Sequence, residues 1–146
     1  MKPILVEIGV GELIDKMTIL AIKQERLTDK KQLENVTKEF VALCKCGDDI
    51  PWDTETSMFA RELRNVNERL WSIEDRLREL EAIKSFSQEF IDLARSVYIL
   101  NDERAALKKQ INTLCGSNLT EEKSYTQYLN EGDSLTPPLK DGPLYR

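Results

Sequence analysis

A chain of 146 residues is long enough for one domain with a continuous core, and its 6 glycines and 5 prolines are few enough to favour helix over disorder. The 26 acidic residues outnumber the 21 basic ones, which argues against a nucleic-acid-binding protein, because phosphate binding needs clustered Lys and Arg. The absence of histidine excludes histidine-based catalytic triads and zinc sites with histidine ligands.

The lengths of the apolar runs and the number of cysteines indicate the cellular location of the protein. No apolar run approaches the roughly 20 residues of a membrane-spanning helix, and residues 3–10 lack the pattern of a signal peptide. Cys44, Cys46 and Cys115 are odd in number, so a complete disulfide framework is impossible. We expect a cytoplasmic protein with reduced thiols that binds neither membrane nor nucleic acid and holds no metal ion or cofactor.

Two short helices are predicted in the first third of the chain. Apolar residues recur at helical spacing over residues 12–27, and Asp29 with Gln32 forms a capping box that begins a second helix over residues 29–45. Gly9 and Gly11 precede the first helix. They favour a simple turn over a phosphate-binding loop, because the spacing and the Lys-Ser/Thr ending of that loop are missing. Gly47 is suited to end the second helix.

Two long helices follow, over residues 53–83 and 87–115. In the first, apolar residues follow one another at spacings of four and three without a miss, and the second carries a similar seam. Asp53 or Thr54 is a predicted N-cap, and Ser85 with Gln88 forms a predicted capping box between the two helices. Because both helices are roughly 45 Å long and closely connected, we expect them to pair as an antiparallel hairpin.

The predicted fold is therefore all-α: a long antiparallel helical hairpin with two shorter helices packed on it, resembling a four-helix bundle, in one domain over residues 1–116. Residues 117–146 lose the helical period and predict an extended or mobile C-terminal tail. Two arrangements stay open. The short helices either cover the surplus apolar side chains of the hairpin or, at only about 24 Å, leave part of it for a homodimer to bury.

Arg104 is the one polar residue in the apolar seam of the last helix. Because an unpaired guanidinium is costly to bury, we expect an acid such as Glu74 of the facing helix beside it. One hypothesis is an internal ion pair that fixes the register of the hairpin. The other makes Arg104 an anion-binding residue in a helical cleft, helped by Arg95, Asn101, Asp102 and either Lys23 or Arg26.

Three segments in the same order resemble a family of small bacterial and phage helical proteins of unknown function. These segments are Gly11–Lys16 with Thr18–Leu20, Leu93–Tyr98 with Asn101–Lys108, and Glu121–Tyr125. The resemblance covers most of positions 4–125 and implies an all-helical cytoplasmic protein. It directs attention to nine polar residues as a candidate ligand-binding site: Asp15, Lys16, Arg26, Glu74, Arg95, Asn101, Asp102, Arg104 and Lys123.

Three classes of function are compatible with these patterns. The lack of a recognised catalytic constellation favours a non-catalytic interaction or scaffold protein, which either forms homo-oligomers or binds a protein partner. The alternative is a helical enzyme or binder of a small anionic ligand, in the manner of chorismate mutase, in which helix-borne cations hold carboxylates. Asp15 and Arg26, on one side of the first helix, suggest it, although no arginine precedes Asp15. A magnesium-dependent nucleotide hydrolase is favoured least, because the third helix lacks a Glu-x-x-Glu pair.

Overall fold

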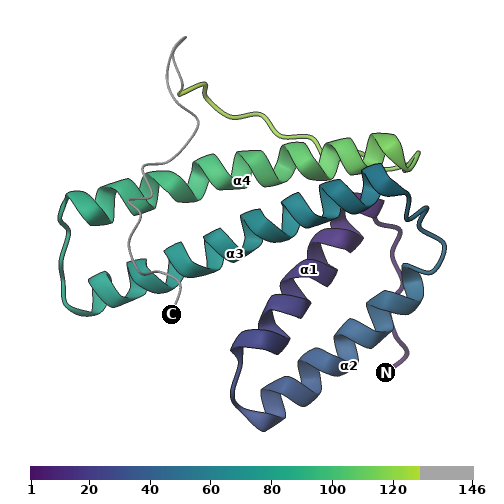
Figure 1. Cartoon of the computed structure of the whole chain (residues 1–146), viewed down its shortest axis with the longest axis horizontal. Coiled ribbons are helices and arrows are strands. Elements are labelled where there is room, and N and C mark those ends of the chain that lie inside the picture. Colours follow the sequence, from purple (N-terminus) through teal and green to yellow (C-terminus); the bar gives the residue numbers. More distant parts are fainter. Residues whose placement is uncertain (129–146) are drawn as a thin grey trace.

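Four helices make up the part of the chain that the structure, a computed structural model, describes, which is residues 1–128 (Figure 1). The all-α prediction is confirmed, and every helix boundary lies within two residues of the predicted one. None of the four helices combines the length and the apolar character needed to cross a membrane. The helices are α1 (Val10–Arg26), α2 (Lys30–Cys46), α3 (Thr54–Ala82) and α4 (Gln88–Leu114).

The helix starts follow the predicted caps in two of three cases. Asp29 accepts a hydrogen bond from the Gln32 backbone N–H at 2.8 Å, and Asp53 accepts one from the Thr56 N–H at 2.7 Å. The capping box predicted at Ser85 is wrong, because α4 begins only at Gln88. The Ser85 N–H instead donates to the carbonyl of residue 80 and so closes the end of α3.

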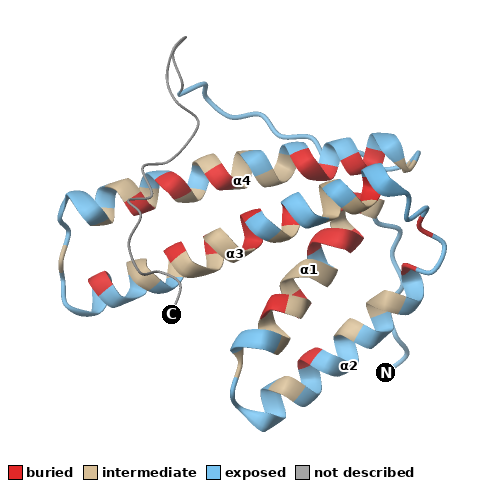
Figure 2. Ribbon diagram, viewed as in Figure 1, coloured by how far each residue is buried: buried red, intermediate tan, exposed pale blue. Residues whose placement is uncertain are grey.

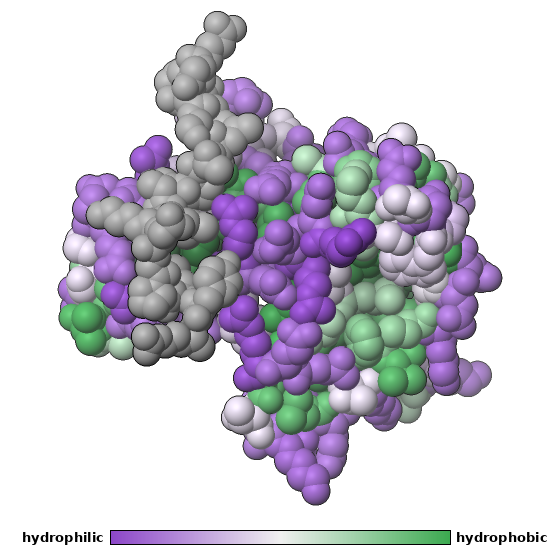
Figure 3. Space-filling model, in the orientation of Figure 1, coloured by the Kyte–Doolittle hydropathy of each residue, from purple (hydrophilic) through white to green (hydrophobic). Residues whose placement is uncertain are grey.

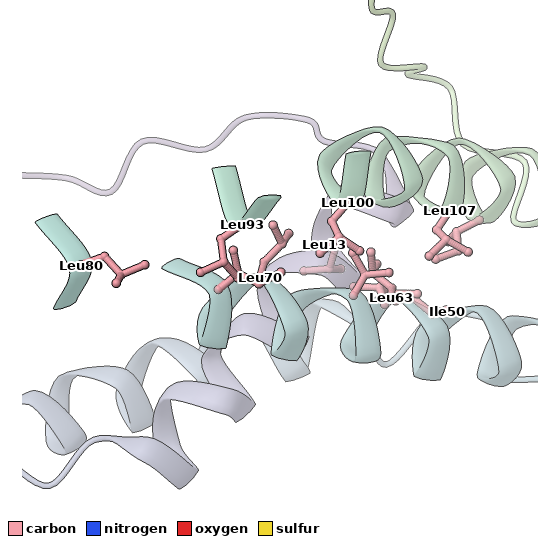
Figure 4. Close-up of a cluster of buried hydrophobic side chains, with 12 residues drawn as sticks. Leu13, Ile50, Leu63, Leu70, Leu80, Leu93, Leu100 and Leu107 are labelled. Carbon is pink, nitrogen blue, oxygen red and sulfur yellow. The ribbon is translucent and has the colours of Figure 1, made fainter. Parts of the chain in front are cut away.

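The core is centred between α3 and α4, which run antiparallel as a long hairpin, and Leu13 and Ile14 of α1 and Ile50 add to it. The predicted apolar seams of α3 and α4 face each other along the length of both helices, as the labelled leucines show (Figure 4). Leu63, Leu100 and Ile111 are fully buried. Figure 2 shows the buried residues along the facing sides of the hairpin. Removal of this apolar surface from water is the main contribution that holds the hairpin together.

The two short helices form a second antiparallel pair that lies across one end of the hairpin (Figure 1). α1 packs against both α3 and α4, whereas α2 makes its helix contacts with α1. The bundle-like arrangement of four helices is confirmed, and α1 packs on the hairpin as predicted, whereas α2 packs on α1 and makes no helix contact with α3 or α4. Neither short helix covers the end where α3 turns into α4, and Ile83, Phe86 and Ile91 are exposed there.

α1 meets α4 at an unusually close junction. The backbone N–H of Gly11 donates to Asn112 Oδ1 at 2.8 Å, and that of Val10 donates to Ser117 Oγ at 2.9 Å. A Cβ atom on Gly11 would overlap the backbone carbonyl of Lys108. Gly9 is thus the N-cap of α1 and Gly11 lies in its first turn, and two of the free N–H groups there are satisfied by side chains at and just beyond the end of α4.

Candidate functional site

A pocket of about 510 Å³ opens where α1 crosses α3 and α4. Its wall combines aliphatic and aromatic side chains with amides and charged groups from three helices. The lining residues are Ile19 and Ile22 of α1, Asn67, Leu70, Trp71, Glu74, Asp75 and Arg78 of α3, and Asn101 and Arg104 of α4. Concave sites of this size and mixed character are typical of small-molecule binding.

A polar network lies at one end of this pocket. The side-chain amide of Asn67 donates to Asp15 Oδ1 at 2.8 Å and to Thr18 Oγ1 at 2.9 Å. Its Oδ1 accepts a hydrogen bond from Arg104 Nη1 at 3.4 Å. Asp15 and Asn67 are buried, whereas Arg104 is half-buried in the pocket wall. The network thus connects a buried carboxylate of α1, through α3, to a guanidinium of α4.

The chemistry of its partners fixes the orientation of Asn67. A carboxylate only accepts hydrogen bonds and a guanidinium only donates them, so the NH₂ group must point to Asp15 and the oxygen to Arg104. The hydrogen bond from Arg104 to Asn67 is long and uses only one of the several N–H donors of the guanidinium group. Within residues 1–128, Arg104 makes no ion pair and the Asn101 amide makes no hydrogen bond. Both side chains therefore keep donors for a molecule that enters the pocket.

The prediction that Arg104 pairs with Glu74 is wrong. Glu74 lies seven residues beyond Asn67, or roughly 10 Å further along α3, and Asn67 is the residue that lies level with Arg104. Glu74 is instead bound by Arg78, whose Nη1 lies 2.8 Å from Glu74 Oε2. Their separation of four residues places these two side chains on the same face of the helix. Arg104 is therefore left without a carboxylate partner in the described part of the chain.

A family model matches residues 4–135 of this chain, and its description is "Family of unknown function (DUF6165)". The chain belongs to this family. The match confirms the expectation of a family of unknown function, while the bacterial or phage source and the cytoplasmic location stay predictions. No curated protein and no solved structure matches the DUF6165 chain.

Several of the nine residues predicted from the sequence gather at the pocket of this DUF6165 chain. Glu74, Asn101 and Arg104 line it, and Asp15 reaches it through Asn67. Arg26 lies at its rim, where the guanidinium stands 5.9 Å from the centre of the Trp71 ring, a cation–π contact. Residues from α1, α3 and α4 that are far apart in the sequence are therefore brought to one site.

The other predicted residues lie away from the pocket wall. Lys16 is exposed and its Nζ lies 3.9 Å from Glu12, one helical turn earlier. Arg95 is also exposed, on α4. Asp102 and Lys123 take part in a different arrangement, in which the chain after α4 runs back along that helix.

Residues 117–128, which we call the return segment, form neither helix nor strand, and residues 129–146, the rest of the predicted extended or mobile tail, lie outside the described residues. Glu121 forms an ion pair with Lys108 at 2.6 Å, and Lys123 lies 3.7 Å from Glu121. Further along, Tyr128 donates a hydrogen bond to Asp102 at 2.5 Å. These contacts dock the segment on α4.

Lys108 is the centre of this docking, because it is buried and paired with two carboxylates. Its Nζ lies 2.6 Å from Glu12 of α1 and 2.6 Å from Glu121 of the return segment. Burial by itself lowers the pKa of Lys108, but the hydrogen bonds that Lys108 donates to the two glutamates, together with their negative charges, raise it by more, and the net shift is upward. The same bond to Lys108 lowers the pKa of Glu121. Glu12 is therefore committed to this cluster, and within residues 1–128 no three acidic or cysteine side chains form a group that could hold a metal ion.

The docking of the return segment is expected to be strongest between about pH 5 and pH 10. The contribution of Glu121 is complete above its usual pKa of 4.5 and is lost as the pH falls through its lowered value. The contribution of Lys108 is complete below its usual pKa of 10.5 and is lost as the pH rises through its raised value. Burial and the bond to Asp102 raise the pKa of Tyr128 to about 12, so its contribution fades between pH 10 and 12.

Near-ultraviolet circular dichroism should report this release, because the rings of Tyr98 and Tyr128 meet edge to face at 4.9 Å. Limited proteolysis within the return segment should become faster at both pH extremes. Glu121→Gln should speed cleavage at pH 7, whereas the matched change Glu122→Gln, in an exposed pair 3.6 Å long, should not. Equal cleavage of both variants would show that Lys108 does not hold the segment.

Asn67 is one of the lining residues that were not among the nine predicted from the sequence, as are Trp71, Asp75 and Arg78. Asn67 lies four residues after Leu63 and three before Leu70, so it stands next to the apolar seam of α3. An amide at such a position has to find hydrogen-bond partners when it is buried, and that was the available signal. Trp71 and Arg78 gave no comparable signal, because the period places them on the outer side of that seam.

Proposed function

We propose that the pocket between α1, α3 and α4 binds a small ligand with a carboxylate or phosphate group, and that Arg104 holds that group. The observation behind the proposal is a half-buried guanidinium in a pocket wall with one long hydrogen bond to Asn67. A guanidinium matches the geometry of carboxylate and phosphate oxygens with two parallel hydrogen bonds. This is the anion-binding hypothesis for Arg104 rather than the structural ion pair.

The surroundings of Arg104 support a built site. Asp15 is buried and holds Asn67, and Asn67 in turn holds one edge of the guanidinium, so the charged group is oriented before a ligand arrives. Asn101, one turn earlier on α4, adds an amide that has no partner in the described residues. Such preorganisation reduces the entropic cost of binding.

Thermal denaturation in the presence of small anions tests this proposal. Inorganic phosphate, citrate, octanoate and nucleoside monophosphates form a suitable first panel. A ligand at 100 times its Kd stabilises the folded protein by about 2.7 kcal/mol. For a chain of this size that corresponds to a rise in Tm of roughly 8 °C. At least one anion of the panel is expected to give a saturable rise.

Arg104→Met should abolish that rise, because methionine keeps the apolar stem and removes the donors. Lys109→Met is the matched control, since it removes one positive charge from an exposed position of the same helix outside the pocket. It should leave the rise in place. No rise with any anion of the panel, or an equal rise in the Arg104→Met protein, would reject the pocket as an anion site.

A second candidate function is self-association as a homodimer, in keeping with a scaffold protein. The observation that favours it is the hairpin tip, which we define as Ile83, Phe86 and Ile91, with exposed fractions of 73%, 55% and 48%. Figure 3 shows apolar side chains at the end of the molecule where α3 turns into α4. Neither α1 nor α2 covers this end, and a second copy of the chain could bury it.

Sedimentation at several protein concentrations tests self-association. A dimer should appear as the concentration rises, and Phe86→Ser should shift the equilibrium to the monomer. A monomer of 16.9 kDa at every concentration would contradict the second candidate and leave the pocket proposal unaffected.

A further inference from the structure

The chemistry of the pocket changes along α3, from an amide at one end to acids at the other. Asn67, which meets Arg104, lies at the first end. Trp71 comes one turn later, about 6 Å along the helix axis, and Asp75 about 12 Å along it. A ligand that fills this pocket lengthwise would therefore meet the guanidinium of Arg104 first, then an aromatic ring and then two carboxylates, one of which is paired with Arg78.

The acidic end has one carboxylate that no cation neutralises within residues 1–128. Glu74 is bound by Arg78, whose Nη1 contacts both its Oε2 and its backbone carbonyl at 2.8 and 2.9 Å. Asp75, its exposed neighbour at the edge of the pocket wall, makes no ion pair or hydrogen bond in that part of the chain. The carboxylate of Asp75 can therefore accept hydrogen bonds from a ligand, and the guanidinium of Arg104 can donate them.

The middle of the pocket is apolar. Ile19, Ile22 and Leu70 join the Trp71 ring there. Arg26 covers the ring at 5.9 Å and donates to Ser72 Oγ at 3.4 Å, so the ring is held in place. An aliphatic or flat segment suits this stretch, because a polar group would lose its water without finding a partner.

We propose that the pocket takes an elongated dipolar ligand, with its carboxylate or phosphate at Arg104, an apolar middle against Trp71, and an amino or guanidino group at Asp75. This inference rests on the proposed function and adds to it the chemical class and the length of the ligand. Opposite charges at the two ends explain why one pocket carries both an unused guanidinium and an unused carboxylate. They also set the direction in which the ligand lies.

A series of ω-amino acids tests the inference by calorimetry or thermal shift. The probes are 4-aminobutanoate, 6-aminohexanoate and 8-aminooctanoate, and each is compared with the straight-chain carboxylate of the same length. Affinity should rise with length, because the two ends of the pocket are roughly 12 Å apart along α3. The wild-type protein should bind 8-aminooctanoate about tenfold more tightly than octanoate, which corresponds to one added charge-assisted contact.

Asp75→Asn should remove that tenfold preference and leave the binding of octanoate unchanged. Glu62→Gln, at an exposed position of α3 outside the pocket, is the matched control and should keep the preference. If octanoate binds in an Arg104-dependent way but the amino group adds no affinity, or if Asp75→Asn keeps the preference, the dipolar ligand is rejected and the anion site stands. If neither probe binds the wild-type protein while another anion of the panel gives an Arg104-dependent rise in Tm, the dipolar ligand is likewise rejected and the anion site stands.

Discussion

Gly11→Ala is expected to lower the free energy of unfolding by about 2–3 kcal/mol, a cost in the range of overpacked cores. The added Cβ would overlap the backbone carbonyl oxygen of Lys108 and lie 2.9 Å from its Cα. Neither atom belongs to a flexible side chain, so α1 has to move away from α4. The same movement would lengthen the hydrogen bond from the Gly11 N–H to Asn112 Oδ1. Thermal or urea denaturation measures the loss, which corresponds to roughly 6–9 °C in Tm.

The sign of this effect is informative, because alanine is the better helix former by about 1 kcal/mol. If helix propensity were the only effect, Gly11→Ala would make the protein more stable. Gly116→Ala provides the matched glycine control. Gly116 has φ +64° and nothing within 4 Å of an added Cβ, so only its backbone conformation carries a cost, about 1 kcal/mol. If the Gly11→Ala protein were as stable as the wild type, α1 and α4 would not be in close contact.

Much of the fold could be predicted because its core follows a simple period. The residues from Leu63 to Leu80 and those from Leu93 to Ile111 each place apolar side chains on one face of a helix. Because a short loop connects the two helices, they can bury both faces by packing against each other as an antiparallel pair. Asp29 and Asp53 marked helix starts through a local interaction that the chain itself specifies. What the period could not give was the placement of α2, which packs on α1.

The candidate site was less predictable, because it depends on which residues of different helices lie level with one another. The sequence directed attention to Arg104 and to Glu74, and both line the pocket. It could not show that Asn67 rather than Glu74 meets Arg104, since that depends on the register of the hairpin to within one turn. Nor could it show that Asp102 is engaged by Tyr128, a contact between segments that no local pattern links.

Asn67→Leu is expected to destabilise the protein by about 3 kcal/mol, although leucine is similar in size to asparagine. The change removes the amide that donates to Asp15 Oδ1 at 2.8 Å and to Thr18 Oγ1 at 2.9 Å. Asp15 is only 5% exposed, so its carboxylate would be left buried without this donor. Breaking a buried polar pair by removing one partner costs several kcal/mol, because the remaining charge keeps its desolvation penalty. Urea denaturation at pH 7 measures the loss.

A double-mutant cycle separates this penalty from a simple loss of packing. Replacing Asp15 and Asn67 together by leucine removes both the donor and the buried charge, and polar pairs exchanged as a whole for apolar groups are often nearly neutral. The double variant should therefore be more stable than the Asn67→Leu protein, by about 1–2 kcal/mol. Losses that simply add would mean that the two side chains do not depend on each other. In that case Asp15 would not be what orients Asn67, and the guanidinium of Arg104 would lack the support that the anion site requires.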